Sequence, residues 1–220
     1  MSNCVNSVSV PFKSYAANDN GIPYCKTNKG TIAGAIMAVP AVILHLQALS
    51  HKPGGTSSDI ESIYREMGLE FGRDEQKLAS DLEKLAMRNK KLAVPFAIIA
   101  GTCTLGAGIL YDNIRNKKAK AAATDIMAGN YGNIYANGDS VATSPMGIPY
   151  YKSTNGVKYG VLSGLACGAV RSAMNCITEK KFTLQNCSPL LLFALGGIIM
   201  GSIAQHSSNK EAEKFSNLVV

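Results

Sequence analysis

The chain has 220 residues, of which 46% are hydrophobic and 17% charged, and its formal net charge is +7. About a quarter of the residues in an average soluble protein are charged, so this composition favours a membrane protein. Most basic residues flank apolar runs, where they act as topology signals or contact anionic lipid. We therefore expect no nucleic-acid partner.

The cysteines and histidines form no metal-binding pattern. Six cysteines occur without a Cys-x-x-Cys pair, and there are only three histidines. We therefore expect no zinc site, no other metal and no cofactor. Cys176 and Cys187 flank a short loop; two free thiols are the favoured interpretation and a disulfide is the alternative.

The first half of the chain, residues 1–120, contains two apolar runs. Residues 1–29 are polar and turn-rich, which predicts a loop. Residues 31–49 carry no formal charge, and a helix of that length spans about 28 Å, close to one hydrocarbon thickness. Residues 92–111 form a second run of similar length. Each run contains a proline, which transmembrane helices tolerate, so we predict a transmembrane helix at both.

A charged insert at 56–91 separates these runs and resembles soluble protein. Ser58 to Glu61 has the pattern of a capping box that opens a helix. A second amphipathic helix is predicted at 78–88, because leucines recur on one of its faces. We favour a helical hairpin that lies over the membrane domain. The alternative is a docking module for a protein partner.

A basic cluster follows the second run. We expect its four members to act as topology signals or to contact lipid head groups; they are Arg115, Lys117, Lys118 and Lys120.

The second half, residues 121–220, has the same organisation with a shorter connector. Residues 121–155 predict mostly loop. Residues 159–177 predict a third transmembrane helix, although it has only twelve uncharged residues between Lys158 and Arg171. Arg171 lies near its end, from where the side chain can extend to the interface. Residues 189–205 predict the fourth transmembrane helix, and a polar tail follows.

Glycines are spaced to lie on one face of these helices. From Gly156 to Gly168 a glycine occupies every fourth position, which leaves a bare strip where another helix can approach closely. We expect Gly160 and Gly164 to meet the equivalent strip of the first helix. The predicted helix-packing glycines are Gly30, Gly34, Gly101, Gly106, Gly156, Gly160, Gly164, Gly168, Gly197 and Gly201; Gly196 and Gly201 match Gly101 and Gly106 in spacing.

A short motif precedes the glycine strip in both halves. It reads Gly-Ile-Pro-Tyr-x-Lys followed by Thr or Ser, and its members are Gly21, Pro23, Tyr24 and Lys26 in the first copy and Gly147, Pro149, Tyr150 and Lys152 in the second. In the favoured interpretation glycine and proline form a turn, tyrosine lies at the membrane interface and lysine contacts head groups. The alternative is a ligand or partner site.

These features predict an all-α integral membrane bundle of four transmembrane helices. Two parallel repeated helical hairpins, 1–120 and 121–220, would form the bundle, with the amphipathic insert in the first. The lipid bilayer is the expected partner, with a homo-oligomer or a protein bound through residues 56–91 in addition. We expect an integral protein of the cell (inner) membrane with both termini in the cytoplasm.

The sequence points away from catalysis. It contains no Walker A motif, no Gly-x-Ser-x-Gly and no His-Glu-x-x-His, and no carboxylate lies inside an apolar run. We therefore expect a non-enzymatic protein with a structural, assembly or partner-scaffolding role. A small oligomeric channel or pore is the alternative, and a membrane enzyme ranks third.

Overall fold

A computed structural model describes residues 15–50, 75–179, 182 and 184–218. The chain is mostly helical, with two small antiparallel sheets. In chain order the elements are β1 (Tyr15–Ala17), β2 (Pro23–Cys25), α1 (Lys29–Ser50), α3 (Glu75–Met127), α4 (Gly132–Ala136), β3 (Ser140–Thr143), β4 (Pro149–Lys152), α5 (Gly156–Glu179) and α6 (Leu184–Ser216).

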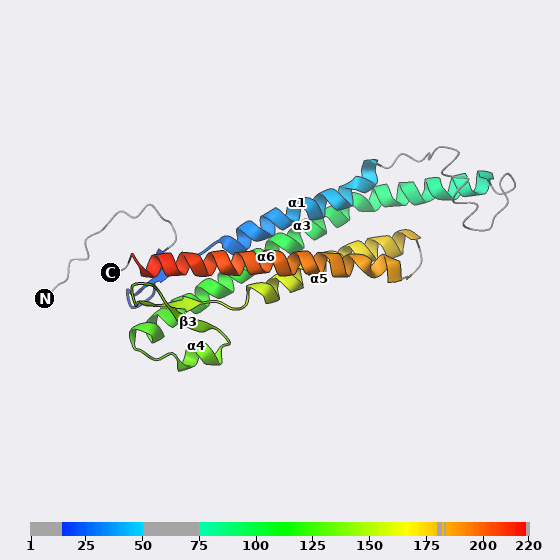
Figure 1. The fold of residues 1–220 in the computed structure, drawn as a ribbon. Coiled ribbons are helices and arrows are strands. Elements are labelled where there is room, and N and C mark those ends of the chain that lie inside the picture. The colour runs from blue at the N-terminus through cyan, green and yellow to red at the C-terminus, as the bar shows by residue number, and fades with distance from the viewer. Residues whose placement is uncertain (1–14, 51–74, 180–181, 183, 219–220) are drawn as a thin grey trace.

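The four long helices form an elongated bundle (Figure 1). α1 packs mainly along α3, and α5 packs mainly along α6, while α3 and α5 provide the largest contact between these two pairs. The β1–β2 and β3–β4 hairpins lie together at the end of the bundle where α1 and α5 begin. We call this end the capped end.

Among the described residues four helices are long and apolar enough to cross a membrane, as many as the sequence predicts. The qualifying segments are Lys29–Gln47, Lys90–Met127, Gly156–Ile177 and Cys187–Ser216. Large aliphatic side chains such as Ile98 and Leu191 are exposed on their outer faces. The outward-facing hydroxyls of Thr102 and Ser202 donate to backbone carbonyls one turn earlier, so these groups are satisfied without water.

The second predicted span is part of a much longer helix. α3 runs without a break from Glu75 to Met127, so the predicted helix at 78–88 is not a separate element. Residues 121–127, expected to be loop, also belong to α3. Its C-terminal part is rich in alanine and lysine, which are strong helix formers. The predicted helix that begins at Ser58 lies outside the described residues.

The all-α prediction is wrong at the two motif segments, which form β-hairpins. Tyr15 pairs with Cys25 in the first, and Ser140 pairs with Lys152 in the second. The loops predicted at 1–29 and 121–155 therefore contain short strands, and the second also contains α4. These strands have only three or four residues, which is too few for alternation in the sequence to be recognised.

The glycine faces meet within each helix pair. A β-carbon at Gly34 of α1 would lie 2.7 Å from the carbonyl oxygen of Thr104 in α3. A β-carbon at Gly160 of α5 would lie 2.8 Å from the Cα of Gly201 in α6. Gly164 lies in the same way against Phe193. The prediction that Gly160 and Gly164 meet the strip of α1 is therefore wrong.

Two of the predicted packing glycines lie away from this close contact. Gly106 is exposed, and nothing lies within 4 Å of a β-carbon placed on it. Gly101 faces only the Val42 side chain. The residue of α3 that meets the strip of α1 is Gly108, which sequence analysis missed. Gly201 has the corresponding position in α6, so the match between Gly106 and Gly201 is off by two residues.

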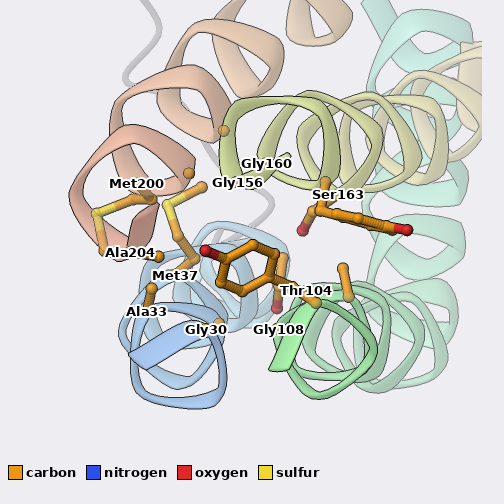
Figure 2. A pocket seen from close by; sticks show the side chains of 16 residues that line it. Gly30, Ala33, Met37, Thr104, Gly108, Gly156, Gly160, Ser163, Met200 and Ala204 are labelled. Atoms are coloured by element: carbon orange, nitrogen blue, oxygen red, sulfur yellow. The ribbon is translucent and has the colours of Figure 1, made fainter. Parts of the chain in front are cut away.

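Side chains from all four helices fill the space between the pairs (Figure 2). The rings of Tyr111 and Tyr159 lie 6.0 Å apart between centroids, while Ala33 and Ala204 lie beside them. The cavity that remains there has a volume of about 40 Å³, which is room for only a few water molecules. The centre of the bundle is thus almost closed.

We predict that Gly108→Ala destabilises the protein and that Gly106→Ala does not. A methyl group at Gly108 would overlap the backbone of Gly30, and overpacking of this kind costs about 1–3 kcal/mol. The same change at Gly106 meets open space and gains up to about 1 kcal/mol in helix propensity. Thermal unfolding in a mild detergent measures both. Equal melting temperatures of the two variants would contradict the packing described here.

Candidate functional site

The glycine of each motif forms the hairpin turn. Gly21 and Gly147 have φ values of +74° and +79°, a left-handed conformation that other residues adopt at a cost. Their backbone N–H groups donate to the carbonyls of Asn18 and Ser144, at 3.0 and 2.9 Å. A three-residue loop that ends in a left-handed glycine is a common hairpin connection. This explains the glycine at the start of both motifs.

The other motif residues divide between the hairpin interior and the surface. Tyr24 and Tyr150 are half-buried and line a cavity described below. Lys26 and Lys152 are exposed.

The last motif residue ties each hairpin to the bundle. Thr27 donates its backbone N–H to the side-chain oxygen of Asn116 and accepts from the Asn116 amide, both at 2.9 Å. Ser153 and Asn209 make the same two bonds at 3.0 and 2.9 Å. A side-chain amide replaces a strand partner at both places, so buried backbone groups stay paired.

A polar side chain also caps the start of α1 and of α5. Asp112 of α3 accepts hydrogen bonds from the backbone N–H groups of Gly30 and Thr31, at 2.9 and 2.6 Å. Gln205 of α6 accepts from the N–H of Gly156 at 2.9 Å. The N-terminal N–H groups of a helix have no partner in the helix itself, and a carboxylate there also interacts favourably with the helix dipole.

A cavity of about 310 Å³ lies at the capped end, between the two hairpins and the ends of α3 and α6. Its walls are mostly apolar and come from both halves of the chain. They are Ile22, Pro23, Tyr24, Cys25, Arg115, Ala119, Ala123, Ile126, Met127, Ile148, Pro149, Tyr150, Tyr151, Ala212, Phe215 and Ser216. This volume is at the lower end of the range for small-molecule pockets.

Arg115 is the charged residue in this wall, and it is only 1% exposed. Its guanidinium donates to the carbonyl oxygens of Cys25 at 2.9 Å and Ser208 at 3.2 Å. Its centre lies 5.8 Å from the centroid of the Tyr151 ring. The Nε–H group is buried without a hydrogen-bond partner. Among the described residues no carboxylate lies within ion-pair distance of Arg115.

Three other titratable groups of the wall have a raised pKa, which keeps them uncharged at neutral pH. Burial raises the pKa of the Cys25 thiol, although the nearby Arg115 opposes this shift. Burial also raises the pKa of Tyr150, with the Glu213 carboxylate as a second cause. The pKa of Tyr151 is raised further, by burial and by Asp139. Arg115 is thus the charged side chain among the residues that line this cavity.

The members of the basic cluster after the second predicted span have different surroundings. Lys118 forms an ion pair with Asp139 at 2.6 Å, and Lys120 forms one with Asp19 at 2.7 Å. Arg115 is buried and lines the cavity described above. Lys117 is exposed. Because α3 continues through the cluster, Lys118 and Lys120 reach residues next to the strands of the two hairpins.

Asp112, the acid at a span boundary, is expected from the sequence to be an interfacial cap, but sequence analysis missed Asn116, Gln205 and Asn209. Gly108, Asp112 and Asn116 follow one another at intervals of four in α3, as do Gly201, Gln205 and Asn209 in α6. Residues four apart lie on the same face of a helix. The signal was therefore present, as a glycine followed by two polar residues at helical spacing.

No family model matches the chain, and neither a curated protein nor a solved structure shows a significant match to it. The fold and composition indicate a membrane protein with four apolar helices. Within the part of the chain that the structure describes, no group of three or more His, Cys, Asp and Glu side chains is placed to hold a metal ion. All five cysteines of that part are free, as expected for Cys176 and Cys187.

We predict that Asn116→Ala and Asn209→Ala each destabilise the protein by about 1–3 kcal/mol. Each change leaves a backbone N–H and a carbonyl without their partner, and buried groups of this kind are costly. The loss should be larger at Asn209, because both of its bonds to Ser153 are buried. Thermal unfolding in detergent provides the measurement.

The matched control for this pair is Asn113→Ala, an exposed position on α3. It should unfold like the wild type. If all three variants unfolded at the same temperature, the two asparagines would not hold the hairpins in place.

Proposed function

We propose that this chain is a non-enzymatic membrane scaffold, built from two copies of one helical unit. Each copy would consist of a β-hairpin and two helices that pack through a glycine ladder. The two copies would run parallel, with both hairpins on one side of the membrane. The single observation that carries this proposal is the pair of matched hairpin anchors, Thr27 with Asn116 and Ser153 with Asn209.

The distribution of polar groups supports a structural role. Several polar side chains at the capped end bond to backbone groups of other elements, as Asp112, Asn116 and Asn209 do. Groups used in this way hold the hairpins and the start of α1 in place. They do not form the nucleophile, base and orienting group that catalysis requires.

The alternative function, a small oligomeric pore, has less support. The cavity between the four helices has about 40 Å³, and the paired tyrosine rings of Tyr111 and Tyr159 occupy the same space. A conducting path would have to run between copies of the chain. The glycine faces are not available for that contact, because they are already used within each helix pair.

We further propose that the protein resides in the cell (inner) membrane with the capped end in the cytoplasm. The motif lysines Lys26 and Lys152 are exposed near this end, together with Lys117. Short loops and flanks with exposed basic residues favour the cytoplasmic side. A protein partner would bind the charged segment at 56–91, whose described part continues α3 away from the capped end (Figure 1).

A photo-crosslinking amino acid at Glu83 tests the scaffold proposal in living cells. Glu83 is exposed and lies within the charged segment. We expect a discrete adduct with one protein partner after illumination. The matched control is the same amino acid at Ile199, which is exposed on the apolar part of α6 and should give lipid adducts alone.

Ion flux in reconstituted vesicles separates the two candidate functions. We expect vesicles that contain the full chain to be no more permeable to ions than empty ones. Flux that scales with the amount of protein, together with no protein adduct at Glu83, would refute the scaffold and favour the pore.

A further inference from the structure

We infer that the cavity at the capped end binds a single-chain amphiphile with an anionic head group, and that Arg115 receives the head. The inference rests on a buried cation, Arg115, that lines a mostly apolar cavity. It goes beyond the proposed scaffold role and does not depend on it.

The buried positive charge of Arg115 favours an anionic ligand. A buried guanidinium that interacts only with neutral carbonyl oxygens and a ring face keeps part of its desolvation cost. Its hydrogen bonds to the oxygens of Cys25, Asn116 and Ser208 use Nη1 and Nη2, and the Nε–H group is buried and unpartnered. Arginine presents its N–H groups in a planar fork that matches carboxylate and phosphate oxygens. An anionic head in the cavity would therefore balance the charge of Arg115.

The rest of the cavity wall favours a ligand with a hydrocarbon chain. Prolines and aliphatic side chains from both hairpins and from α3 and α6 surround the chamber, including Ile22, Ile126, Ile148 and Phe215. The wall offers no second charge that would hold a zwitterionic or dianionic ligand. The volume of about 310 Å³ suits one chain of medium length and is too small for a phospholipid with two chains.

The location of the cavity also fits a ligand from the membrane. It lies toward the C-terminal ends of the candidate spans Cys187–Ser216 and Lys90–Met127. An amphiphile in the adjacent leaflet has its head group at this level and its chain directed toward the bundle.

Binding of tritiated dodecanoate to the full chain in nanodiscs of neutral phospholipid tests the inference. We expect saturable binding above the level of empty nanodiscs, and dodecanol should compete at least tenfold more weakly than unlabelled dodecanoate. Dodecanesulfonate should compete as well as dodecanoate, because both heads carry a single negative charge. Equal competition by dodecanol would show that the chamber takes up apolar chains without regard to charge, and would overturn the role of Arg115.

Two pairs of variants locate the site. Arg115→Met removes the charge but keeps the side-chain length, and we expect it to weaken dodecanoate binding at least tenfold. Its control, Lys117→Met, removes an exposed charge from the same helix and should bind like the wild type. Ala123→Leu places a larger apolar side chain in the cavity, leaves Arg115 unchanged and should also abolish dodecanoate binding. Its control, Ala121→Leu, is at an exposed position and should bind like the wild type.

The second pair keeps the test decisive if Arg115→Met fails to fold. Unchanged dodecanoate binding by a folded Ala123→Leu protein would overturn the inference, as would the absence of saturable binding to the wild type.

Discussion

In each helix pair the backbone of one helix touches the backbone of the other, and this close approach determines where the other elements lie. Glycines make it possible, because a β-carbon at Gly34 or Gly160 would meet atoms of the facing helix at less than 3 Å. In a bilayer no hydrophobic force drives apolar helices together, so close packing and polar contacts must hold them. The glycine faces supply the packing, and they bring the polar residues that follow them within reach of their partners.

The polar contacts of the capped end follow directly from this geometry. Asp112 lies one helical turn beyond Gly108, and Asn116 lies one turn further, so all three share the face that meets α1. Only helices in close contact allow a side chain as short as Asp112 to reach the backbone of Gly30. The hairpin that precedes α1 then continues the same line of contact, with Thr27 bonded to Asn116. The second half repeats this arrangement with Gln205 and Asn209.

The two halves of the chain differ in the positions of their large side chains. When Gly108 of α3 is aligned with Gly201 of α6, Tyr111 and Arg115 of α3 correspond to Ala204 and Ser208 of α6. The large side chains of α3 therefore extend over the small residues of α6, and Arg115 reaches the Ser208 carbonyl across the interface. This asymmetry closes the centre of the bundle and also places the positive charge in the cavity. A strictly symmetric protein would lack both features.

Much of the architecture could be predicted from the sequence. The number of spans follows from the apolar runs, and the face that packs follows from the glycine spacing. The partner of each face could not be predicted, because a period of four residues identifies a face and not the helix that it meets. The continuity of α3 was missed because charged residues before 92 and after 111 resembled the ends of a span, although Ala119 and its neighbours favour helix. The cavity was missed because its wall combines residues from both hairpins, α3 and α6, which lie far apart in the sequence.

Disulfide trapping in native membranes tests the pairing of the helices most directly. A β-carbon at Gly101 would lie 2.9 Å from the Val42 side chain, so cysteines at 42 and 101, in a chain without its native cysteines, should crosslink on mild oxidation. Cysteines at 34 and 164 report on contact between the glycine strips of α1 and α5 and should stay reduced. Crosslinking at 34 and 164, without crosslinking at 42 and 101, would contradict pairing of α1 with α3.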